Sequence, residues 1–255
     1  MELNPDEDFD VLSFQFEMLG LDEVARDVSS KLNKSVKQLY SADKVLSDKD
    51  LDLVDKALES MKDYPIYVVD NIGTVQNIYD TILFYLSSKR LIENKRGLVV
   101  TIDNASLVMG DESGEKQTID KLMHTLVLIK KYVSSIGGKI MFIVISQLNR
   151  QLESNDRVLN PKLHYPNKSD LFGASSVYNS SDYVVIIHRP CLIEGIGNWY
   201  GPPRKNWDRG LPVFNPKNTS QPMTYLHVIK ERFGSNTIIP MLDDLGNSRI
   251  IDYPL

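Results

Sequence analysis

Three apolar segments of this chain each end in one polar side chain that could do chemistry. The segments and the side chains that follow them are 10–16 with Glu17, 98–102 with Asp103, and 139–146 with Gln147. Two carboxylates and an amide at one edge suit hydrolysis of a nucleoside triphosphate, because one acid activates water, one holds Mg²⁺ through water, and the amide senses the γ-phosphate. The usual phosphate-binding sequence, G-x-x-x-x-G-K-[ST], does not occur in the 255 residues.

The elements that must position these residues follow from the apolar pattern. Short runs rich in Val, Ile and Phe, separated by segments of helix length, predict buried strands of a parallel sheet with crossover helices. We expect strands at 10–16, 65–70, 98–103, 139–146 and 181–188, and helices at 19–32, 46–61, 76–94 and 118–135. Ser47 is the expected N-cap of the second helix. Because ligands bind beyond the carboxyl ends of such strands, the three polar side chains should converge on one crevice.

The remaining segments are less regular. Residues 149–169 are polar without a period, and residues 190–222 hold six of the twelve prolines, so both are expected to be loops. Two runs at 225–230 and 236–242 predict a closing β-hairpin around Phe233 and Gly234.

Bulk composition narrows the class of protein. A length of 255 residues with 42% apolar composition fits one large α/β domain, and no repeat or second domain is evident. The net charge of −5 has the wrong sign for a protein that coats nucleic acid with its whole surface. No apolar run approaches the roughly 20 residues of a membrane span. The single cysteine, Cys191, excludes an internal disulfide and fits a reducing cytoplasm.

Several other chemistries are weakly supported. Gly137-Gly138-Lys139 follows a helix and precedes a strand, which makes it a helix stop and not a phosphate loop. The four histidines lack metal-ligand spacing, and no G-x-S-x-G motif is present. Glu17 taken alone is equally compatible with capping the next helix. Basic and aromatic residues of segment 199–217 could stack on single strands or form a solvated loop, namely Trp199, Tyr200, Arg204, Lys205, Trp207, Arg209 and Lys217.

Five segments together resemble one known family. In order and spacing, SFQFEM (13–18), LVVTIDNASLV (98–108), VISQLNR (144–150), the block at 170–189 and VIKERFG (228–234) are similar to the RecA-like motor domain of DnaB-type replicative helicases. The resemblance covers about residues 10–242, and SQLNR after a β run is its most specific piece. It implies an α/β fold with a RecA-like, mostly parallel twisted sheet, flanking helices and a C-terminal β-hairpin.

The resemblance also implies roles for single residues. Glu17 matches the glutamate that polarises the attacking water, Asp103 matches the Walker B acid that binds Mg²⁺ through water, and Gln147 matches the glutamine that couples the γ-phosphate to the DNA-binding loops. Lys230 and Arg232 match a basic pair that reaches into the neighbouring subunit's nucleotide site. The other matched positions are Arg26 and Arg189 at the nucleotide, and Arg150, Phe172, Gly173 and Ala174 toward DNA.

The resemblance implies an ATP- and Mg²⁺-dependent DNA helicase that moves on single-stranded DNA as a hexameric ring. Primase or a helicase loader would be a further partner. The protein would act in the bacterial cytoplasm, encoded by a bacterium or a phage. Residues 1–255 would be its single motor domain, without the Walker A strand, loop and helix and without the primase-binding domain, so this chain alone should not hydrolyse ATP. Two features depart from the family. The DNA-facing loop, usually D-L-R-E-S-G, reads D-L-F-G-A-S at 170–175, and Asn104 replaces a tyrosine.

Two alternatives remain open. A RecA-like subunit that no longer hydrolyses could serve as an assembly or DNA-binding partner, and the altered loop at 170–175 favours this. The other alternative is a recombinase or loader of the same fold. Retention of the acids, the glutamine and the basic pair together favours the helicase.

Overall fold

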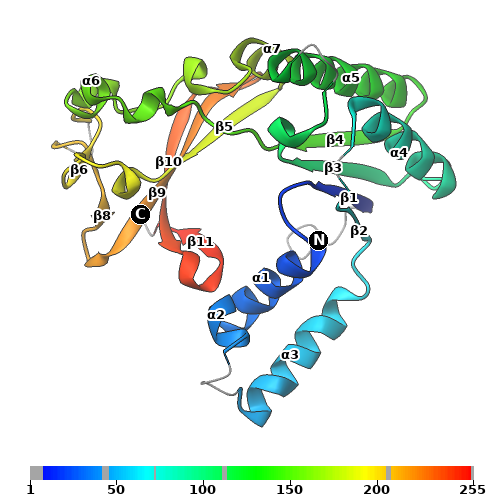
Figure 1. Cartoon of the computed structure of the whole chain (residues 1–255), viewed down its shortest axis with the longest axis horizontal. Coiled ribbons are helices and arrows are strands. Elements are labelled where there is room, and N and C mark those ends of the chain that lie inside the picture. The colour runs from blue at the N-terminus through cyan, green and yellow to red at the C-terminus, as the bar shows by residue number, and fades with distance from the viewer. Residues whose placement is uncertain (1–7, 42–45, 72, 111–113, 205–207, 254–255) are drawn as a thin grey trace.

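The first half of the chain forms a parallel sheet. The computed structural model describes residues 8–41, 46–71, 73–110, 114–204 and 208–253. The sheet has the strand order β2-β1-β3-β4 (Figure 1). Its strands are β1 (Phe9–Gln15), β2 (Ile66–Val69), β3 (Gly97–Asp103) and β4 (Lys139–Val144). All three pairings are parallel, so the predicted parallel sheet is confirmed for four of the five expected strands. The fifth, at 181–188, lies in the antiparallel sheet instead, because it pairs with a strand of the C-terminal hairpin.

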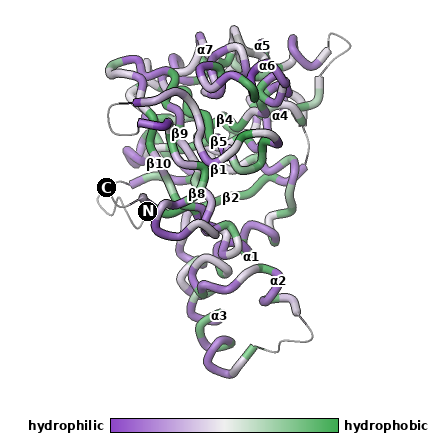
Figure 2. The backbone as a smooth tube through the Cα atoms, turned by 90° about the vertical axis from the view of Figure 1, so that its left-hand side faces the viewer, coloured by the Kyte–Doolittle hydropathy of each residue, from purple (hydrophilic) through white to green (hydrophobic). Residues whose placement is uncertain are grey.

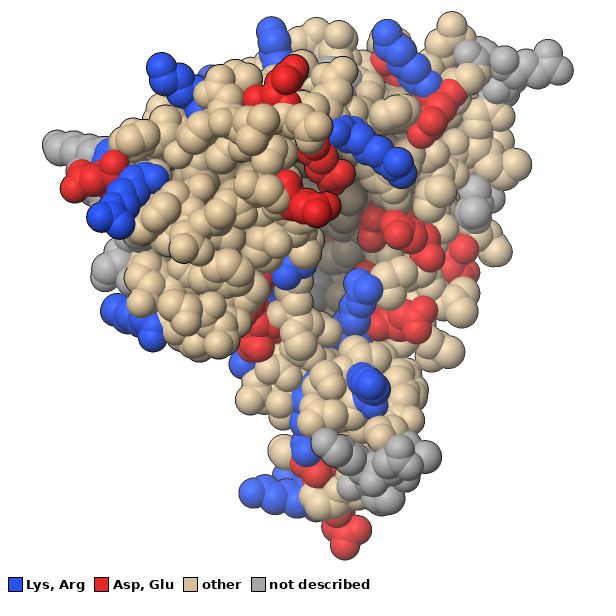
Figure 3. All heavy atoms as spheres, turned by 60° about the vertical axis from the view of Figure 1, so that its left-hand side comes forward, with Lys and Arg blue, Asp and Glu red and all other residues tan. Residues whose placement is uncertain are grey.

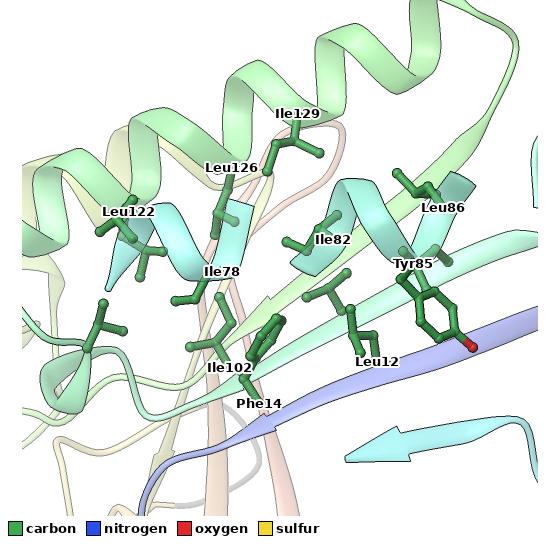
Figure 4. Packing of buried hydrophobic residues seen from close by; sticks show 14 of the residues in the cluster. Leu12, Phe14, Ile78, Ile82, Tyr85, Leu86, Ile102, Leu122, Leu126 and Ile129 are labelled. Atoms are coloured by element: carbon green, nitrogen blue, oxygen red, sulfur yellow. The ribbon is translucent and has the colours of Figure 1, made fainter. Parts of the chain in front are cut away.

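Two helices cover one face of this sheet and form the main core with it. They are α4 (Val75–Ser88) and α5 (Glu115–Ser135). Alternate side chains of the strands point toward these helices, as Figure 4 shows for Leu12, Phe14 and Ile102. Ile82 of α4 and Leu122 of α5 are completely buried against them. Burial of each such side chain stabilises the fold by about 1.5–3 kcal/mol, so this layer holds the strand ends in place.

Helix boundaries follow local signals. The predicted helices α1 (Gly20–Leu32) and α3 (Asp48–Met61) are confirmed, and Ser47 caps α3 in a reciprocal capping box with Asp50. The prediction that α4 extends to residue 94 was wrong, because Arg90 adopts a left-handed φ of 50° just after the helix ends. Two further short helices were not predicted, α2 (Val36–Leu39) and α7 (Ala174–Ser180). Figures 1 and 2 both show α2 and α3 projecting away from the sheet.

The second half of the chain builds an antiparallel sheet. Its order is β11-β10-β9-β5, and a short strand β8 (Phe214–Asn215) also pairs with β9. The strands are β5 (Tyr183–His188), β9 (Asn218–Glu231), β10 (Thr237–Asp244) and β11 (Arg249–Asp252). The predicted hairpin is confirmed as β9 and β10, although β9 begins earlier than expected. Phe233, in the hairpin turn, is 87% exposed.

The two segments predicted to be loops contain regular structure. Residues 149–169 include α6 (Asn155–Val158) and short 3-10 helices. Residues 190–222 include β6 (Trp199–Tyr200), β7 (Leu211–Pro212), β8 and the start of β9. Apolar residues here are scattered singly among prolines and glycines, so no period reveals that they share a second core, made of Tyr200, Leu211, Val213, Met223, Tyr225 and Leu242.

This second core corrects the idea that segment 199–217 clamps single strands with its aromatic rings. Tyr200 has no exposed surface, so it cannot stack on a base. Trp199 remains 40% exposed, with the Arg209 guanidinium 6.0 Å from its ring centroid. Lys205 and Trp207 lie outside the described residues.

A buried polar cluster sits within the second core. The Tyr200 hydroxyl lies 2.6 Å from Nδ1 of His188 and 2.8 Å from Nε2 of His227. Burial, reinforced by the charge of Arg157, lowers the pKa of His188 to about 4. Burial, reinforced by His188, lowers the pKa of His227 to about 3. Both imidazoles are therefore neutral in the folded protein at neutral pH.

These two histidines should make the fold sensitive to acid. Between about pH 6.5 and 4, the unfolded chain binds a proton at each site and the folded chain does not, so the free energy of unfolding falls by about 1.4 kcal/mol per pH unit for each histidine as the pH drops. His227→Gln keeps a polar partner for Tyr200 and removes one of the two titrating groups. The pH dependence of the free energy of unfolding should therefore fall by about 1.4 kcal/mol per pH unit, the share of one histidine, as measured by urea unfolding at a series of pH values. His124→Gln, at an exposed position of α5, should leave the slope unchanged. An unchanged slope in His227→Gln would show that His227 is not held neutral.

Candidate functional site

The predicted acids meet at the carboxyl edge of the parallel sheet. Phe16 N–H donates to the carbonyl oxygen of Asp103 over 2.7 Å, which joins the end of β1 to the end of β3. Directly beyond, Asn104 Nδ2 donates to Glu17 Oε2 over 2.9 Å. Glu17 does not cap α1, whose N-cap is Leu19 without a side-chain hydrogen bond. The expectation that Glu17 and Asp103 lie together is met by this geometry.

Helix α1 brings two more charges to this edge. Gln15 Nε2 donates to Glu23 Oε1 over 2.7 Å, which fixes the first turn of α1 beside the strand ends. Burial, and then the Glu17 carboxylate, raise the pKa of Asp103, while Arg26 opposes the shift. Burial, and then Asp103, raise the pKa of Glu23, again opposed by Arg26. Arg26 therefore lies close enough to act on both acids, and Glu23 is an additional acid that the sequence did not single out.

The sheet beneath these charges is polar. Register places Ser13 opposite Thr101 and Gln15 opposite Asp103, with their side chains on the face away from α4 and α5. Thr101 Oγ1 and Gln15 Nε2 each donate to Ser13 Oγ over 2.7 Å. Ser13 and Gln15 are almost fully buried, so this network orients the side chains that support the acids.

Gln147 stands at the end of the neighbouring strand. Ile145 N–H donates to the carbonyl of Ile102, and Ala105 N–H donates to the carbonyl of Ile145, both over 2.9 Å. These bonds carry the β3–β4 pairing up to the edge where Asp103 lies. Gln147 itself is exposed, and its carbonyl oxygen accepts from Phe172 N–H over 3.2 Å. The backbone thus connects the edge of the sheet directly to the segment expected to face DNA.

That segment is held firmly in place. Asp170 has no exposed surface and pairs with Arg157 Nη1 at 2.5 Å, while Arg157 Nη2 donates to the carbonyl of Tyr165 over 2.9 Å. Phe172 packs against the apolar cluster of Ile119, Met123 and Val177. Gly173, at φ 68°, precedes α7, which Ala174 begins. Of the positions expected to bind DNA, Phe172 therefore has a partly buried ring, and Gly173 offers only its backbone. Arg150 is exposed and lies in a short 3-10 helix after Gln147.

The basic pair at the end of β9 contacts a different part of the molecule. Lys230 Nζ donates to the carbonyl of Tyr178 over 2.5 Å. Arg232 Nη1 lies 3.0 Å from Asp182 Oδ1, and the backbone N–H of Arg232 donates to the backbone carbonyl of Asp182. Both cations thus point to the same side, toward residues 178–182, and Arg232 is exposed.

Arg189 is engaged elsewhere. Its Nε donates to Asp243 Oδ2 of β10 over 2.6 Å, and Asp243 is almost fully buried and also binds the Thr224 hydroxyl. This ion pair joins the end of β5 to β10 inside the antiparallel sheet. The structure does not bring Arg189 to Glu17 and Asp103 through any of these contacts.

The donor set at the strand ends suits Mg²⁺ bound through water. In the described ranges, no group of three or more His, Cys, Asp or Glu side chains is arranged to bind a metal ion directly. The acids nevertheless raise one another's pKa, as the effects of Glu17 on Asp103 and of Asp103 on Glu23 show. A hydrated divalent cation would relieve this repulsion, and carboxylate oxygens are its preferred protein ligands. Asp103, whose pKa is raised by burial and by Glu17, is one residue that could hold it.

The fold and the acids at its strand ends define a RecA-like α/β domain. One solved structure, described as an ATPase domain, superposes with a TM-score of 0.70 at 16% identity, over 96% of this chain and 75% of that one. A solved DnaB-like replicative helicase, described with its interactions with primase, superposes with a TM-score of 0.69 at 16% identity, over 96% of this chain and 51% of that one. The chain therefore spans about half the length of that helicase.

The family model described as DnaB-like helicase C terminal domain matches residues 2–242. The chain belongs to this family. A comparison with curated proteins found no significant match. Within the described residues, no helix is long and apolar enough to cross a membrane.

The crowding of acids leads to a prediction about Asp103. Because its pKa is raised in the folded state, the folded chain binds the proton more tightly than the unfolded chain, and stability is lost as the pH rises through the folded pKa. Asp103→Asn removes the charge and should raise the melting temperature modestly at pH 7, with the gain fading in acid. Asp55→Asn, at an exposed position of α3, is the matched control and should show no such gain. A lower melting temperature in Asp103→Asn would mean that a contact in the protein stabilises the ionised carboxylate.

Proposed function

We propose that this chain is the motor domain of a DnaB-like replicative DNA helicase, which uses ATP and Mg²⁺ to translocate on single-stranded DNA and unwind duplexes. The observation that carries the proposal is the meeting of Glu17 and Asp103 at the ends of paired strands, with the backbone of β4 bonded alongside up to Gln147. Residues 1–255 form one motor domain in this proposal, and the phosphate-binding segment comes from outside the sequence. The intact protein works as a hexameric ring in the bacterial cytoplasm, whether a bacterium or a phage encodes it.

The geometry supports a division of labour between the two acids. Asn104 anchors Oε2 of Glu17, so we assign Oε1 to the water that attacks the γ-phosphate. Asp103 lies under the influence of Glu17 and Arg26 and would hold a hydrated Mg²⁺, which would supply neutralisation of phosphate charge. Gln147 is exposed at the same edge and its backbone binds Phe172, which supports a role in passing nucleotide state to the segment near DNA.

The basic pair supports a site shared between subunits. Lys230 and Arg232 contact residues 178–182 beside the antiparallel sheet, whereas Glu17 and Asp103 lie on the parallel sheet. An exposed cation so placed can stabilise phosphate charge on a neighbouring subunit, as an arginine finger does. Primase or a helicase loader is a further proposed partner, and the related DnaB-like helicase has been described with primase.

A second candidate function is supported by one observation. In segment 170–175 the side chains of Asp170 and Leu171 are buried, and Phe172 and Gly173 stand where the resemblance leads one to expect an arginine and a glutamate. A subunit that assembles with helicases or binds DNA without hydrolysing ATP fits this feature. The retained acids favour the motor domain.

The isolated chain and the intact protein should differ in their ability to hydrolyse ATP. Backbone amides and a lysine that cradle the β- and γ-phosphates supply most of the electrostatic attraction for a nucleotide, and this sequence has no such loop. The isolated chain should therefore release phosphate from ATP no faster than its Asp103→Asn variant, measured at steady state with Mg²⁺. Turnover clearly above that of the variant would show that the chain forms a complete site by itself.

Mixing of variant subunits can test whether the nucleotide site is shared between neighbouring subunits. In a chimera that joins this chain to a phosphate-loop segment, Glu17→Gln should slow ATP hydrolysis by about 10²–10⁴-fold, and Arg232→Ala should slow it by about 10³-fold or more. Mixed rings of the two variants should regain ATPase activity, because some interfaces then pair an intact Glu17 with an intact Arg232. If rings mix and no activity returns, Arg232 acts within its own subunit or has no role in hydrolysis.

A further inference from the structure

The helix that follows the segment expected to face DNA is short. α7 has seven residues and begins directly after Gly173, and its buried Val177 belongs to the apolar cluster on which Phe172 packs. A helix of this length has little stability of its own, because the backbone groups at both of its ends have no partner within the helix. The position of Phe172 and Gly173 therefore depends on what holds α7.

The carboxyl end of α7 is held by Lys230 of β9. Lys230 Nζ donates to the carbonyl of Tyr178 over 2.5 Å and to the carbonyl of Asn179 over 3.2 Å. It also lies 5.0 Å from the centroid of the Tyr178 ring. Both carbonyls belong to the last turn of α7, where they lack a partner in the helix and where the helix dipole favours a cation. Lys230 thus supplies hydrogen bonds that this short helix cannot make for itself.

A β-bulge in β9 aims Lys230 at this helix. Lys230 pairs with Val184 of β5, whereas Val228 pairs with Val185, so Ile229 is an extra residue of β9. A bulge bends its strand and redirects the side chains next to it. The Tyr178 hydroxyl donates to the carbonyl of Ile229 over 3.4 Å, which makes a second link between the bulge and α7. The local structure of β9 is therefore built around the end of α7.

Arg232, on the same side of β9, has a different kind of partner. Its guanidinium pairs with Asp182, and its side chain is 50% exposed. Asp182 is shared with Lys130 of α5, whose Nζ lies 2.5 Å from Oδ2. The hydrogen bond from Lys130 is the main cause that lowers the pKa of Asp182, and the charge of Arg232 adds to it. Arg232 can therefore leave Asp182 for another anion while that carboxylate keeps a cation.

We propose that Lys230 is a positioning residue that holds α7 and, through α7, the segment 172–174, and that Arg232 alone is the cation of this pair offered to a neighbouring subunit. The roles of the segment at DNA and of Arg232 at phosphate rest on the proposed function. The contact between Lys230 and α7 does not, and it narrows the shared nucleotide site to one cation of the two.

Exact placement of this segment matters because the charge of the chain does not attract a polyanion. The net charge is −5, and on the face shown in Figure 3 lysine and arginine side chains are spread among acidic ones and do not gather in one patch. Phe172 and Gly173 carry no charge, so they can contact a single strand only by stacking and by backbone hydrogen bonds, which both require fixed geometry. Loss of Lys230 should therefore weaken DNA binding although Lys230 does not touch DNA.

The test compares Lys230→Met with Arg232→Met in the full chain, since each variant removes one cation from the same side of β9 and keeps an apolar stem. Hydrogen exchange of the backbone amides is followed by mass spectrometry without DNA or nucleotide. We expect the amides of 172–181 to exchange about tenfold faster in Lys230→Met, because hydrogen bonds from a charged donor are lost. Arg232→Met should exchange like the wild type, and Lys230→Arg, which can still donate to carbonyl groups, should keep the protection.

DNA binding is measured on the same proteins by fluorescence anisotropy of a labelled oligothymidylate over a range of salt concentrations. Lys230→Met should bind at least about fivefold more weakly than the wild type, the equivalent of one stacked base, while Lys230→Arg and Arg232→Met bind like the wild type. The slope of log K against log salt concentration should be the same for Lys230→Met and the wild type, because Lys230 makes no phosphate contact.

The proposal is overturned if residues 172–181 of Lys230→Met exchange like the wild type, if Arg232→Met accelerates their exchange as much, or if exchange accelerates across the whole chain. A salt slope smaller by about one in Lys230→Met would make Lys230 a direct phosphate contact and would overturn it as well. If the expected exchange pattern appears but the wild type does not bind the oligothymidylate, Lys230 holds α7 as proposed and the assigned contact of this segment with DNA is wrong.

Discussion

The parallel register of β1 on β3 is the constraint on which both the core and the candidate site depend. It pairs Phe14 with Ile102 and Gln15 with Asp103. A slip of one residue would move Leu12 and Phe14 out of the core and turn Ser13 and Gln15 into it. The apolar packing beneath α4 and α5 therefore excludes a slip by one residue, and the observed register is also the one that brings Phe16 N–H to the Asp103 carbonyl and Glu17 to Asn104. The stability of the core and the geometry of the acids have a single origin.

The first half of the fold was accessible from the sequence because its signals are local. Apolar runs of strand length, Ser47 with Asp50 at a helix start, and the Gly137-Gly138 stop each specify an element without knowledge of distant residues. Parallel topology then sends all strand ends to one edge, which is why Glu17, Asp103 and Gln147 could be grouped. Glu23 could not, since an acid in the first turn of a helix is favoured by the helix dipole and carries no sign of another role.

The second half was less accessible because its organisation depends on contacts between distant residues. β5 looks like the earlier strands, yet it pairs antiparallel with β9, which follows only after the long proline-rich segment. Tyr200 was taken for a surface aromatic because it lies among basic residues and prolines, and only His188 and His227, on other strands, show that its hydroxyl is bound in a core. Likewise the burial of Asp170 depends on Arg157, and neither residue alone indicates a pair. Such polar contacts leave no periodic trace in a sequence.

The face of the sheet opposite α4 and α5 changes character from its centre to its margin. On β1 and β3 it carries Ser13, Gln15 and Thr101, which are linked by hydrogen bonds, and Asp103, and Gln15 is also bonded to Glu23 at the start of α1. On β4 the paired positions are apolar, since Thr101 lies opposite Ile143. A polar centre is suited to supporting charged side chains and a hydrated ligand at the strand ends, whereas apolar side chains at a free edge are suited to contact with protein. The boundary between the polar and the apolar part of this face therefore runs along the β3–β4 pairing.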